Sequence, residues 1–120
     1  SIENRPIKAH KVAGDVVCFD FVNICEGPRS QNDYIELATL FTTVLISNVP
    51  VLDTTREDAA RRFISLVDEF YDRRVKLILS ADEGIANLYQ GQRLSFEFQR
   101  TQSRLLEMQS ESYLGEPHVS

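Results

Sequence analysis

The sequence predicts an α/β domain: a small mixed sheet of about four strands, an N-terminal hairpin followed by a parallel βαβαβ unit, with three helices. Three observations indicate this class. Short apolar runs alternate with longer segments whose apolar residues recur at helical spacing. Two successive strand-to-strand connections each contain one such segment, as connections between parallel strands do. The 120 residues and the 42% hydrophobic share suit one domain with its own core.

The hairpin is expected at the start of the chain. Ile7–Val12 is a short predicted strand, and Val16–Val22, rich in β-branched and aromatic residues, is the second. Gly14 lies between them and can adopt the positive φ of a tight turn. Gly27–Ser30 is then a loop, because Gly and Pro interrupt both helices and strands.

The first helix follows this loop. Asp33 is the expected N-cap, with Glu36 completing a capping box, and the apolar positions at helical spacing are Tyr34, Leu37, Ala38 and Phe41. Thr42–Ile46 is then a strand with almost no polar alternation, which predicts burial on both faces. Residues 48–55 form a connection, because Pro50 opposes regular ladder pairing.

The strongest predicted helix begins at a second capping box, Thr54 with Glu57. Its expected buried face consists of Ala59, Phe63, Leu66, Val67 and Phe70. Three acid-before-base pairs at i, i+4 are each expected to contribute about 0.2–0.5 kcal/mol. These pairs are Glu57–Arg61, Asp58–Arg62 and Glu69–Arg73.

The last part of the chain contains the fourth strand and the last helix. Val75–Leu79 is the strand, expected to be parallel to the two before it, and Asp82–Tyr89 is a weak helix or turn. Leu94–Phe98 suits either a strand or the start of a helix. Phe98–Ser112 is a helix with one line of residues at Thr101, Leu105, Met108 and Ser112. The domain is expected to be ordered over about 4–114, with residues 115–120 as a frayed tail.

Composition argues against several classes of function. The net charge of −5 argues against binding to DNA. The apolar runs are far shorter than the roughly 20 residues of a membrane span, so none is expected. Cys18 and Cys25 lack CxxC spacing, and the two histidines lie at opposite ends of the chain. We therefore expect no metal site, and two reduced thiols in a cytosolic protein.

Three apolar runs end in a carboxylate, at Asp20, Asp53 and Asp68, as do the strands that hold magnesium in nucleotide hydrolases. Polar residues also end many strands where the chain reaches the surface, and Asp68 falls on a predicted helix. The sequence has no Gly-x-x-x-x-Gly-Lys-Ser/Thr loop, whose backbone amides and lysine hold phosphates. We therefore expect no catalytic residue and no nucleotide hydrolysis within this chain.

Arg100 and Arg104 are the first candidate contacts for a phosphate or a partner. They lie one helical turn apart on one face and repel each other unless neutralised. Glu97 and Glu107 are placed to neutralise them, which would make this face structural. The alternative is a pair reserved for a phosphate or a partner's carboxylate, because guanidinium groups suit both.

Arg61 and Arg62 are the second candidate pair. Consecutive residues on a helix point about 100° apart, so one can pair with a local acid while the other reaches elsewhere.

Several strings resemble the C-terminal part of the ZapE-type, Afg-like ATPases of the AAA+ class. The resemblance extends from about Asn4 to Leu114 and rests on their combination: ICEGPRSQNDY at 24–34, ARRFI at 60–64, LVDEFYD at 66–72, VKL at 75–77, FQRT at 98–101, SRL at 103–105 and EMQS at 107–110.

The resemblance implies that these 120 residues are one C-terminal domain of a longer bacterial cytoplasmic ATPase. The phosphate-binding loop and the magnesium-binding acid of that protein would precede Ser1, so ATP and magnesium are expected for the parent and no cofactor for this chain. Bacterial members are linked to cell division and to the division-ring protein FtsZ, and mitochondrial relatives to protein quality control. The partners this implies are the rest of the ATPase and FtsZ or other division proteins, with action at the division site.

Two readings of function stay open. In the first, an accessory domain couples the ATPase core to partner binding or self-assembly, either by donating an arginine to a neighbouring subunit's phosphates or by moving as a docking surface. In the second, the chain is a protein-interaction module with no nucleotide role. A free-standing small α/β enzyme is disfavoured by the missing motifs.

Overall fold

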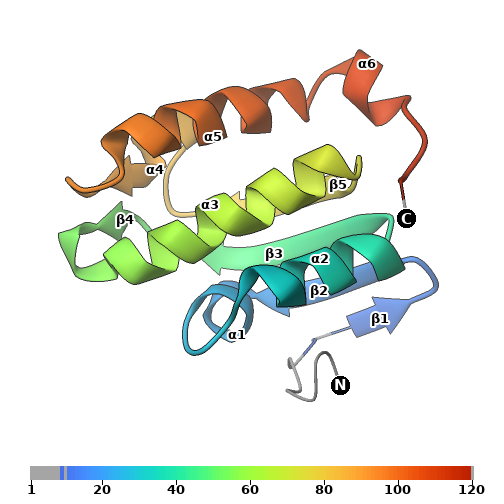
Figure 1. Ribbon diagram of the computed structural model, residues 1–120, viewed down its shortest axis with the longest axis horizontal. Coiled ribbons are helices and arrows are strands. Elements are labelled where there is room, and N and C mark those ends of the chain that lie inside the picture. Colours follow the sequence, from blue (N-terminus) through green and yellow to red (C-terminus); the bar gives the residue numbers. More distant parts are fainter. Residues whose placement is uncertain (1–8, 10, 120) are drawn as a thin grey trace.

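The computed structural model describes residues 9 and 11–119 and has two layers, one of strands and one of helices (Figure 1). The extents of 37 × 34 × 21 Å suit this arrangement, because the short dimension is about the thickness of one sheet and one helix layer. The main sheet has four strands in the order β1-β2-β3-β5. The predicted α/β class and mixed sheet are confirmed.

The strands of the main sheet are β1 (Lys11–Ala13), β2 (Val16–Asp20), β3 (Thr43–Val49) and β5 (Lys76–Ala81). β1 pairs with β2 in antiparallel fashion, whereas β2, β3 and β5 are parallel, as predicted. Gly14 has a φ of 61° at the hairpin turn. Of the first predicted strand, residues 7, 8 and 10 lie outside the described residues.

The longer helices are α2 (Gln31–Leu40), α3 (Glu57–Asp72) and α5 (Ser95–Glu107). The shorter elements are α1 (Phe21–Cys25), β4 (Leu52–Asp53), the 3₁₀ turn η1 (Thr54–Arg56), α4 (Ile85–Leu88), β6 (Tyr89–Gln90) and α6 (Glu111–Leu114). β4 and β6 pair in parallel as a second, two-stranded sheet that the sequence did not predict.

The prediction that the strand Thr42–Ile46 is buried on both faces was wrong. Along β3, Val44, Ile46 and Val49 are buried, but the residues between them are only partly covered or exposed. The strand order explains this. Successive right-handed crossovers that step in one direction along a sheet place their helices on the same face, which leaves the other face without a helix layer.

Several predicted element ends were also wrong. The second strand ends at Asp20, because Phe21, Ile24 and Cys25 have helical spacing and form the buried side of α1. The N-cap of α2 is Ser30, whose backbone N–H donates to Asp33 Oδ2 at 2.9 Å in a capping box.

The last predicted helix is divided into two. α5 begins at Ser95 and ends at Glu107, and Leu94 is its N-terminal flanking residue. Ser110 then caps α6, where its hydroxyl accepts from the Tyr113 backbone N–H at 3.1 Å. Ser112 therefore lies on α6 and is exposed, whereas Thr101, Leu105 and Met108 are buried as expected.

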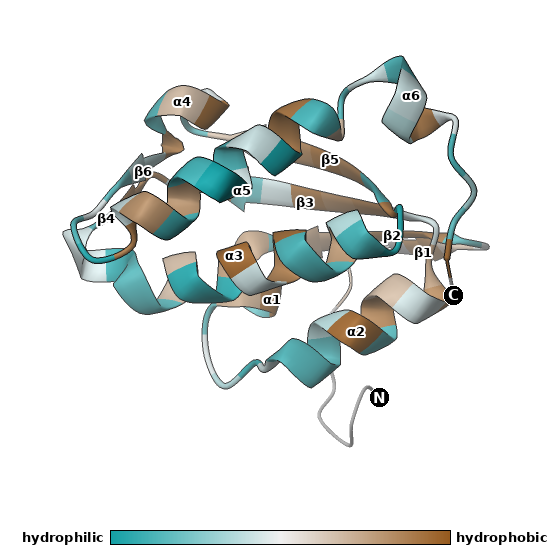
Figure 2. Ribbon diagram, turned by 45° about the horizontal axis from the view of Figure 1, so that its top comes forward, coloured by the Kyte–Doolittle hydropathy of each residue, from teal (hydrophilic) through white to brown (hydrophobic). Residues whose placement is uncertain are grey.

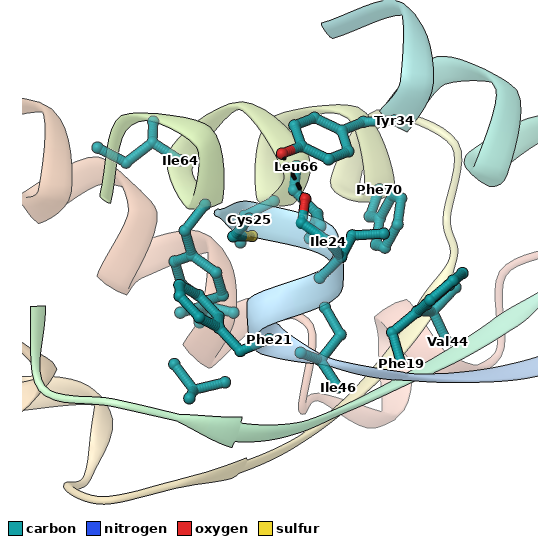
Figure 3. Packing of buried hydrophobic residues seen from close by; sticks show 14 of the residues in the cluster. Phe19, Phe21, Ile24, Cys25, Tyr34, Val44, Ile46, Ile64, Leu66 and Phe70 are labelled. Atoms are coloured by element: carbon teal, nitrogen blue, oxygen red, sulfur yellow. Dashed lines mark hydrogen bonds between the residues drawn. The ribbon is translucent and has the colours of Figure 1, made fainter. Parts of the chain in front are cut away.

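Helix α3 lies at the centre of the core. Its predicted apolar face is buried, with Phe63, Leu66, Val67 and Phe70 each at 0% exposure. The Phe63 ring packs between those of Phe21 and Phe98, at centroid distances of 6.1 and 6.3 Å. Figure 3 shows α1 between α3 and the sheet, with Tyr34 approaching from α2. Figure 2 shows hydrophobic colour along β3 and β5 and alternating colour on α3 and α5, as two packed layers require.

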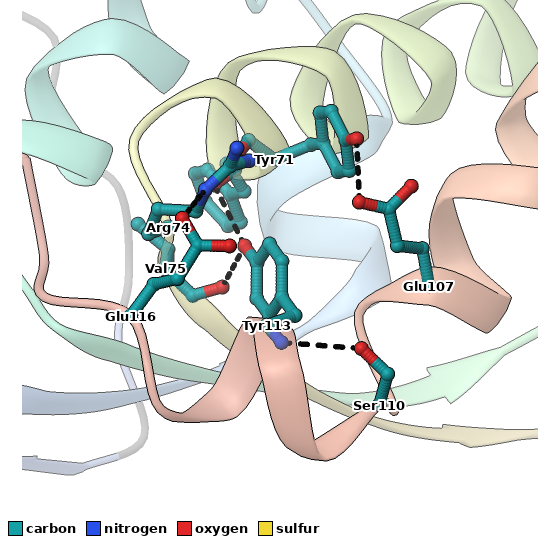
Figure 4. A network of polar contacts seen from close by, with 8 residues as sticks. Tyr71, Arg74, Val75, Glu107, Ser110, Tyr113 and Glu116 are labelled. Carbon is teal, nitrogen blue, oxygen red and sulfur yellow. Dashed lines mark hydrogen bonds and ion pairs between the residues drawn. The ribbon is translucent and has the colours of Figure 1, made fainter.

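The C-terminal segment packs against the end of α3 (Figure 4). The buried Tyr113 hydroxyl donates to the Val75 carbonyl at 2.7 Å. Arg74 lies over the rings of Tyr71 and Tyr113 and pairs with Glu116 at 2.8 Å. Beyond Gly115, where the sequence predicted a frayed tail, the Val119 N–H donates to the Arg73 carbonyl at 2.9 Å and His118 Nε2 lies 2.5 Å from the Ala38 carbonyl.

Glu57 anchors the loop that leads into α5. Its carboxylate accepts from the Tyr89 hydroxyl at 2.6 Å and from the backbone amides of Gln92 and Arg93 at 2.9 Å each. The Glu57 carboxylate therefore forms neither the predicted capping box with Thr54 nor the predicted ion pair with Arg61. Asp53 caps η1 instead, accepting from the Thr55 N–H.

The other two predicted i, i+4 pairs are also absent among the described residues. Glu69 accepts from the Gln31 amide at 2.9 Å instead of pairing with Arg73, and Asp58 forms no ion pair with Arg62. For Glu69, a side chain from another element, which local spacing cannot reveal, therefore replaces the expected partner.

Gly91 is required by this anchor. A Cβ at this position would lie 2.5 Å from Glu57 Oε1 and 2.6 Å from the Tyr89 hydroxyl. We predict that Gly91→Ala lowers the free energy of unfolding by about 1–3 kcal/mol, as overpacking does, measured by urea denaturation. The matched control is Gly84→Ala, because no atom lies within 4 Å of its Cβ position. Equal stability of the two variants would contradict the anchor.

The Glu57 anchor also predicts a pH dependence. The Tyr89 hydroxyl, followed by the two backbone amides, holds the pKa of Glu57 below its ordinary value. Its stabilising effect is therefore complete above the unfolded pKa, about 4.3, and is lost as pH falls through the lower folded pKa. Glu57→Gln should be less stable than wild type at neutral pH, and the gap should narrow below about pH 4. A constant gap in urea denaturation from pH 7 to pH 3 would count against the anchor.

Candidate functional site

Three arginines from two elements meet at one surface pocket of about 280 Å³. Arg29 comes from the loop between α1 and α2, whereas Arg61 and Arg62 come from α3. We call this the arginine pocket; its lining residues are Arg29, Ser30, Gln31, Tyr34, Asp58, Arg61, Arg62 and Ser65.

Buried contacts hold the loop that forms one wall of the arginine pocket. The Tyr34 hydroxyl donates to the Ile24 carbonyl at 2.8 Å inside the core. Arg62 Nη1 donates to the Cys25 carbonyl at 3.4 Å, which connects α3 to the end of α1. Arg29 Nε donates to the Asn23 carbonyl at 3.3 Å. The loop is therefore held in place by two side chains that face the pocket, Arg29 and Arg62, and by the buried side chain of Tyr34.

The charge balance of the arginine pocket favours an anion. Its lining carries three guanidinium groups and one carboxylate, that of Asp58. The Arg61 side chain is exposed and forms no hydrogen bond or ion pair with any residue among 9 and 11–119. Guanidinium groups bind phosphate and carboxylate oxygens through charge-assisted hydrogen bonds, so the pocket can bind either anion.

Cys25 and Tyr34 are the ionisable thiol and hydroxyl beside the arginine pocket. Burial raises the pKa of the Cys25 thiol far above its ordinary value, and Cys25 is fully buried. Burial likewise raises the pKa of Tyr34. Both groups stay protonated near neutral pH, so neither is an activated nucleophile.

Arg100 and Arg104 converge on a different residue. Arg104 Nη1 lies 2.5 Å from Asp68 Oδ1, and Arg100 Nη2 lies 3.3 Å from Asp68 Oδ2. Arg104 also lies over the Tyr71 ring, 4.8 Å from its centroid. The sequence placed Glu97 and Glu107 as their partners, but the neutralising carboxylate comes from α3.

The four candidate arginines therefore divide into two groups. Arg61 and Arg62 line the arginine pocket, while Arg100 and Arg104 pair across the α3–α5 contact. Glu107 is occupied by the Tyr71 hydroxyl, which donates to it at 2.8 Å. Sequence reasoning did not single out Arg29, because a loop residue 32 positions before Arg61 shows no local spacing signal.

The described part of the chain offers little to a metal ion. Among residues 9 and 11–119 there is no group of three or more His, Cys, Asp or Glu side chains that could hold one. The three run-ending carboxylates, Asp20, Asp53 and Asp68, lie on separate elements, and Asp53 and Asp68 are used by the η1 cap and the arginine pair. No helix in the same range is both long and apolar enough to cross a membrane.

The comparisons with known proteins agree on one protein family. The model of the AFG1-like ATPase family matches residues 1–117. The chain is 50% identical over 119 residues to "Cell division protein ZapE" of Escherichia coli, covering 99% of this chain and 32% of that protein. It is 33% identical over 145 residues to "Lactation elevated protein 1 homolog B" of Danio rerio, covering 94% of this chain and 29% of that protein. No solved structure matches the chain significantly. The chain thus spans about a third of the length of these relatives.

Arg100 and Arg104 both pair with Asp68, but their contacts predict different losses of stability when each is replaced by alanine. Arg104 is 25% exposed and contacts both Asp68 and Tyr71, whereas Arg100 is 60% exposed. We predict that Arg104→Ala lowers the free energy of unfolding by about 1 kcal/mol. Arg100→Ala should change it by no more than about 0.5 kcal/mol. Urea denaturation of both variants measures this, and a larger loss in Arg100→Ala would show that the cluster is assigned wrongly.

Proposed function

Because this chain belongs to the AFG1-like ATPase family, we propose that it is the C-terminal accessory domain of an ATP-hydrolysing cell-division protein of the ZapE type. In this role it couples the ATPase core to partner binding or self-assembly. The observation that carries the proposal is the arginine pocket, where Arg61 is exposed and without a partner among the described residues, next to Arg29 and Arg62.

Hydrolysis itself is assigned to the rest of the polypeptide. The sequence has no Gly-x-x-x-x-Gly-Lys-Ser/Thr loop, and the described residues hold no group of acids suited to magnesium. These residues therefore do not fit a complete ATP–magnesium site. ATP and magnesium belong to the parent protein in this proposal.

An arginine can serve such a core by contacting phosphate. Charge develops on the transferred phosphoryl group, and a guanidinium supplied by another domain or subunit neutralises it. Arg61 suits this role better than Arg104, because Arg104 is already bound to Asp68 and stacked on Tyr71. A move of the core toward or away from the arginine pocket would then link nucleotide state to the position of this domain.

The proposed setting is the bacterial cytoplasm at the division site. The E. coli relative, at 50% identity, is called a cell division protein. The partners we propose are the rest of the ATPase and FtsZ or other division proteins, as the family resemblance implies.

The second candidate function is a protein-interaction module that never approaches nucleotide. The pairing of Arg100 and Arg104 with Asp68 favours it, because these two arginines are satisfied inside the domain. In this alternative the arginine pocket binds a carboxylate of a partner protein, which guanidinium groups also suit.

The experiment that separates the two functions measures ATP turnover by the complete protein. If Arg61 contacts the γ-phosphate, Arg61→Ala should lower kcat by roughly 10³-fold or more, with unchanged unfolding in urea. Arg93→Ala is the matched control, because Arg93 is an exposed arginine outside the arginine pocket. Wild-type turnover in Arg61→Ala, Arg62→Ala and Arg29→Ala would reject the phosphate contact and support the interaction module.

A further inference from the structure

The outer edge of strand β5 is open. β5 is the last strand of the main sheet and pairs only with β3 among the described residues. The Lys76 N–H donates to the Thr42 carbonyl at 2.8 Å and the Asp82 N–H donates to the Val49 carbonyl at 2.9 Å. Backbone groups alternate in direction along a strand. The N–H and C=O groups of Leu77, Leu79 and Ala81 therefore point away from β3.

A groove of about 450 Å³, lined by both apolar and polar residues, adjoins this strand. Its lining includes Leu77 and Leu79 of β5, Leu105 of α5 and Met108, the residue that caps the C-terminal end of α5. In Figure 1, α5 lies farther out than β5, so the helix layer extends beyond the sheet layer at this side. We call this space the β5 groove. It is lined by residues of β5 together with residues of α4 and α5.

The edge lacks most of the features that protect a lone strand. Lys76 is its only charged residue, it contains no proline, and Ile78 on the other face is 54% exposed. Open apolar edges are sites of strand pairing, and natural proteins block or cover them. Both the unpaired backbone and the groove therefore point to an extended occupant.

We propose that one extended segment from the remainder of the family polypeptide pairs with β5 and fills the β5 groove. This proposal rests on the proposed function, in which these residues are one domain of a longer ATPase. The matched residues are 32% of the E. coli relative, which leaves about two-thirds of that polypeptide to supply the segment. Its backbone bonds to Leu77, Leu79 and Ala81, and its alternate apolar side chains fill the β5 groove beside the partly buried side chains of Leu77 and Leu79.

The negative charge at one end of the β5 groove indicates which charge the bound segment carries there. Asp82 and Glu83 lie at the end where β5 leads into α4, and neither forms an ion pair with another described residue. A basic residue of the added strand is complementary to them. The occupant is thus an extended segment with alternating apolar residues and a lysine or arginine at one end.

A second copy of this chain fits the groove poorly. Pairing of two β5 edges would bring a second α5 into the space over the same two strands. Helices pack at interaxial distances of 8–10 Å, whereas neighbouring strands are about 4.8 Å apart. Two α5 helices that each extend beyond their own β5 would therefore overlap.

Residue-resolved amide hydrogen exchange in the complete protein tests the proposal. The inward amides of Lys76, Ile78 and Ser80 are the internal reference, because the β3 ladder protects them. We expect the outward amides of Leu77, Leu79 and Ala81 to exchange roughly 100-fold or more slowly than an unstructured peptide, at every protein concentration. Rapid exchange of these outward amides beside protected inward ones would overturn the proposal, as would protection that appears only as concentration rises.

A pair of variants of the complete protein sharpens the test. Ala81→Pro removes an outward N–H without touching the β3 ladder, whereas Ala81→Val retains it. Ala81→Pro should speed exchange at Leu77 and Leu79 by roughly tenfold, and Ala81→Val should not; equal exchange in both variants would count against strand pairing. The readout does not involve the arginine pocket, so lost ATP turnover in Arg61→Ala with rapid outward exchange would reject only the strand. Wild-type ATP turnover in Arg61→Ala together with slow exchange of the outward amides would reject only the phosphate contact.

Discussion

Burial of one face of α3 is the constraint on which the rest of this structure depends. Eight of its residues are buried, seven of them in the hydrophobic core, and the helix contacts α1, α2, α5 and β4. Its remaining face carries the charged groups: Arg61 and Arg62 toward the loop before α2, and Asp68 toward α5. Because helical spacing fixes which residues face inward, burial of Phe63 and Phe70 also fixes where the arginines point.

The order of the strands is the second constraint on where the helices lie. Each crossover steps the same way along the sheet, so the helices gather on one face and the layer they form ends with α5 beyond β5. Glu57 fixes this outer position, because its carboxylate holds the loop from which α5 starts. The β5 groove therefore results from the order of the strands and from the buried carboxylate of Glu57. It lies at the edge opposite β1, on the far side of α3 from the arginine pocket's loop.

Local patterns predicted the features that depend on local chemistry. The hairpin, the three parallel strands and the buried face of α3 follow from β propensity, turn residues and helical periodicity. The errors concern partners distant in the chain. Glu57 binds a loop 32 to 36 residues away, and Asp68 takes the arginines for which Glu97 and Glu107 were expected. Two of the candidate site residues, Arg61 and Arg62, were found from sequence, but their meeting with Arg29 depends on the tertiary fold.

The structure proposed for the complete protein is one in which the rest of a longer ATPase polypeptide completes this domain. A structure of the complete protein, determined by electron cryomicroscopy with bound nucleotide, measures this most directly. The account predicts a strand from outside these 120 residues beside β5 and beneath α5, with the arginine pocket facing the nucleotide-binding core. A structure in which the β5 edge faces solvent and the arginine pocket faces away from the core would contradict it.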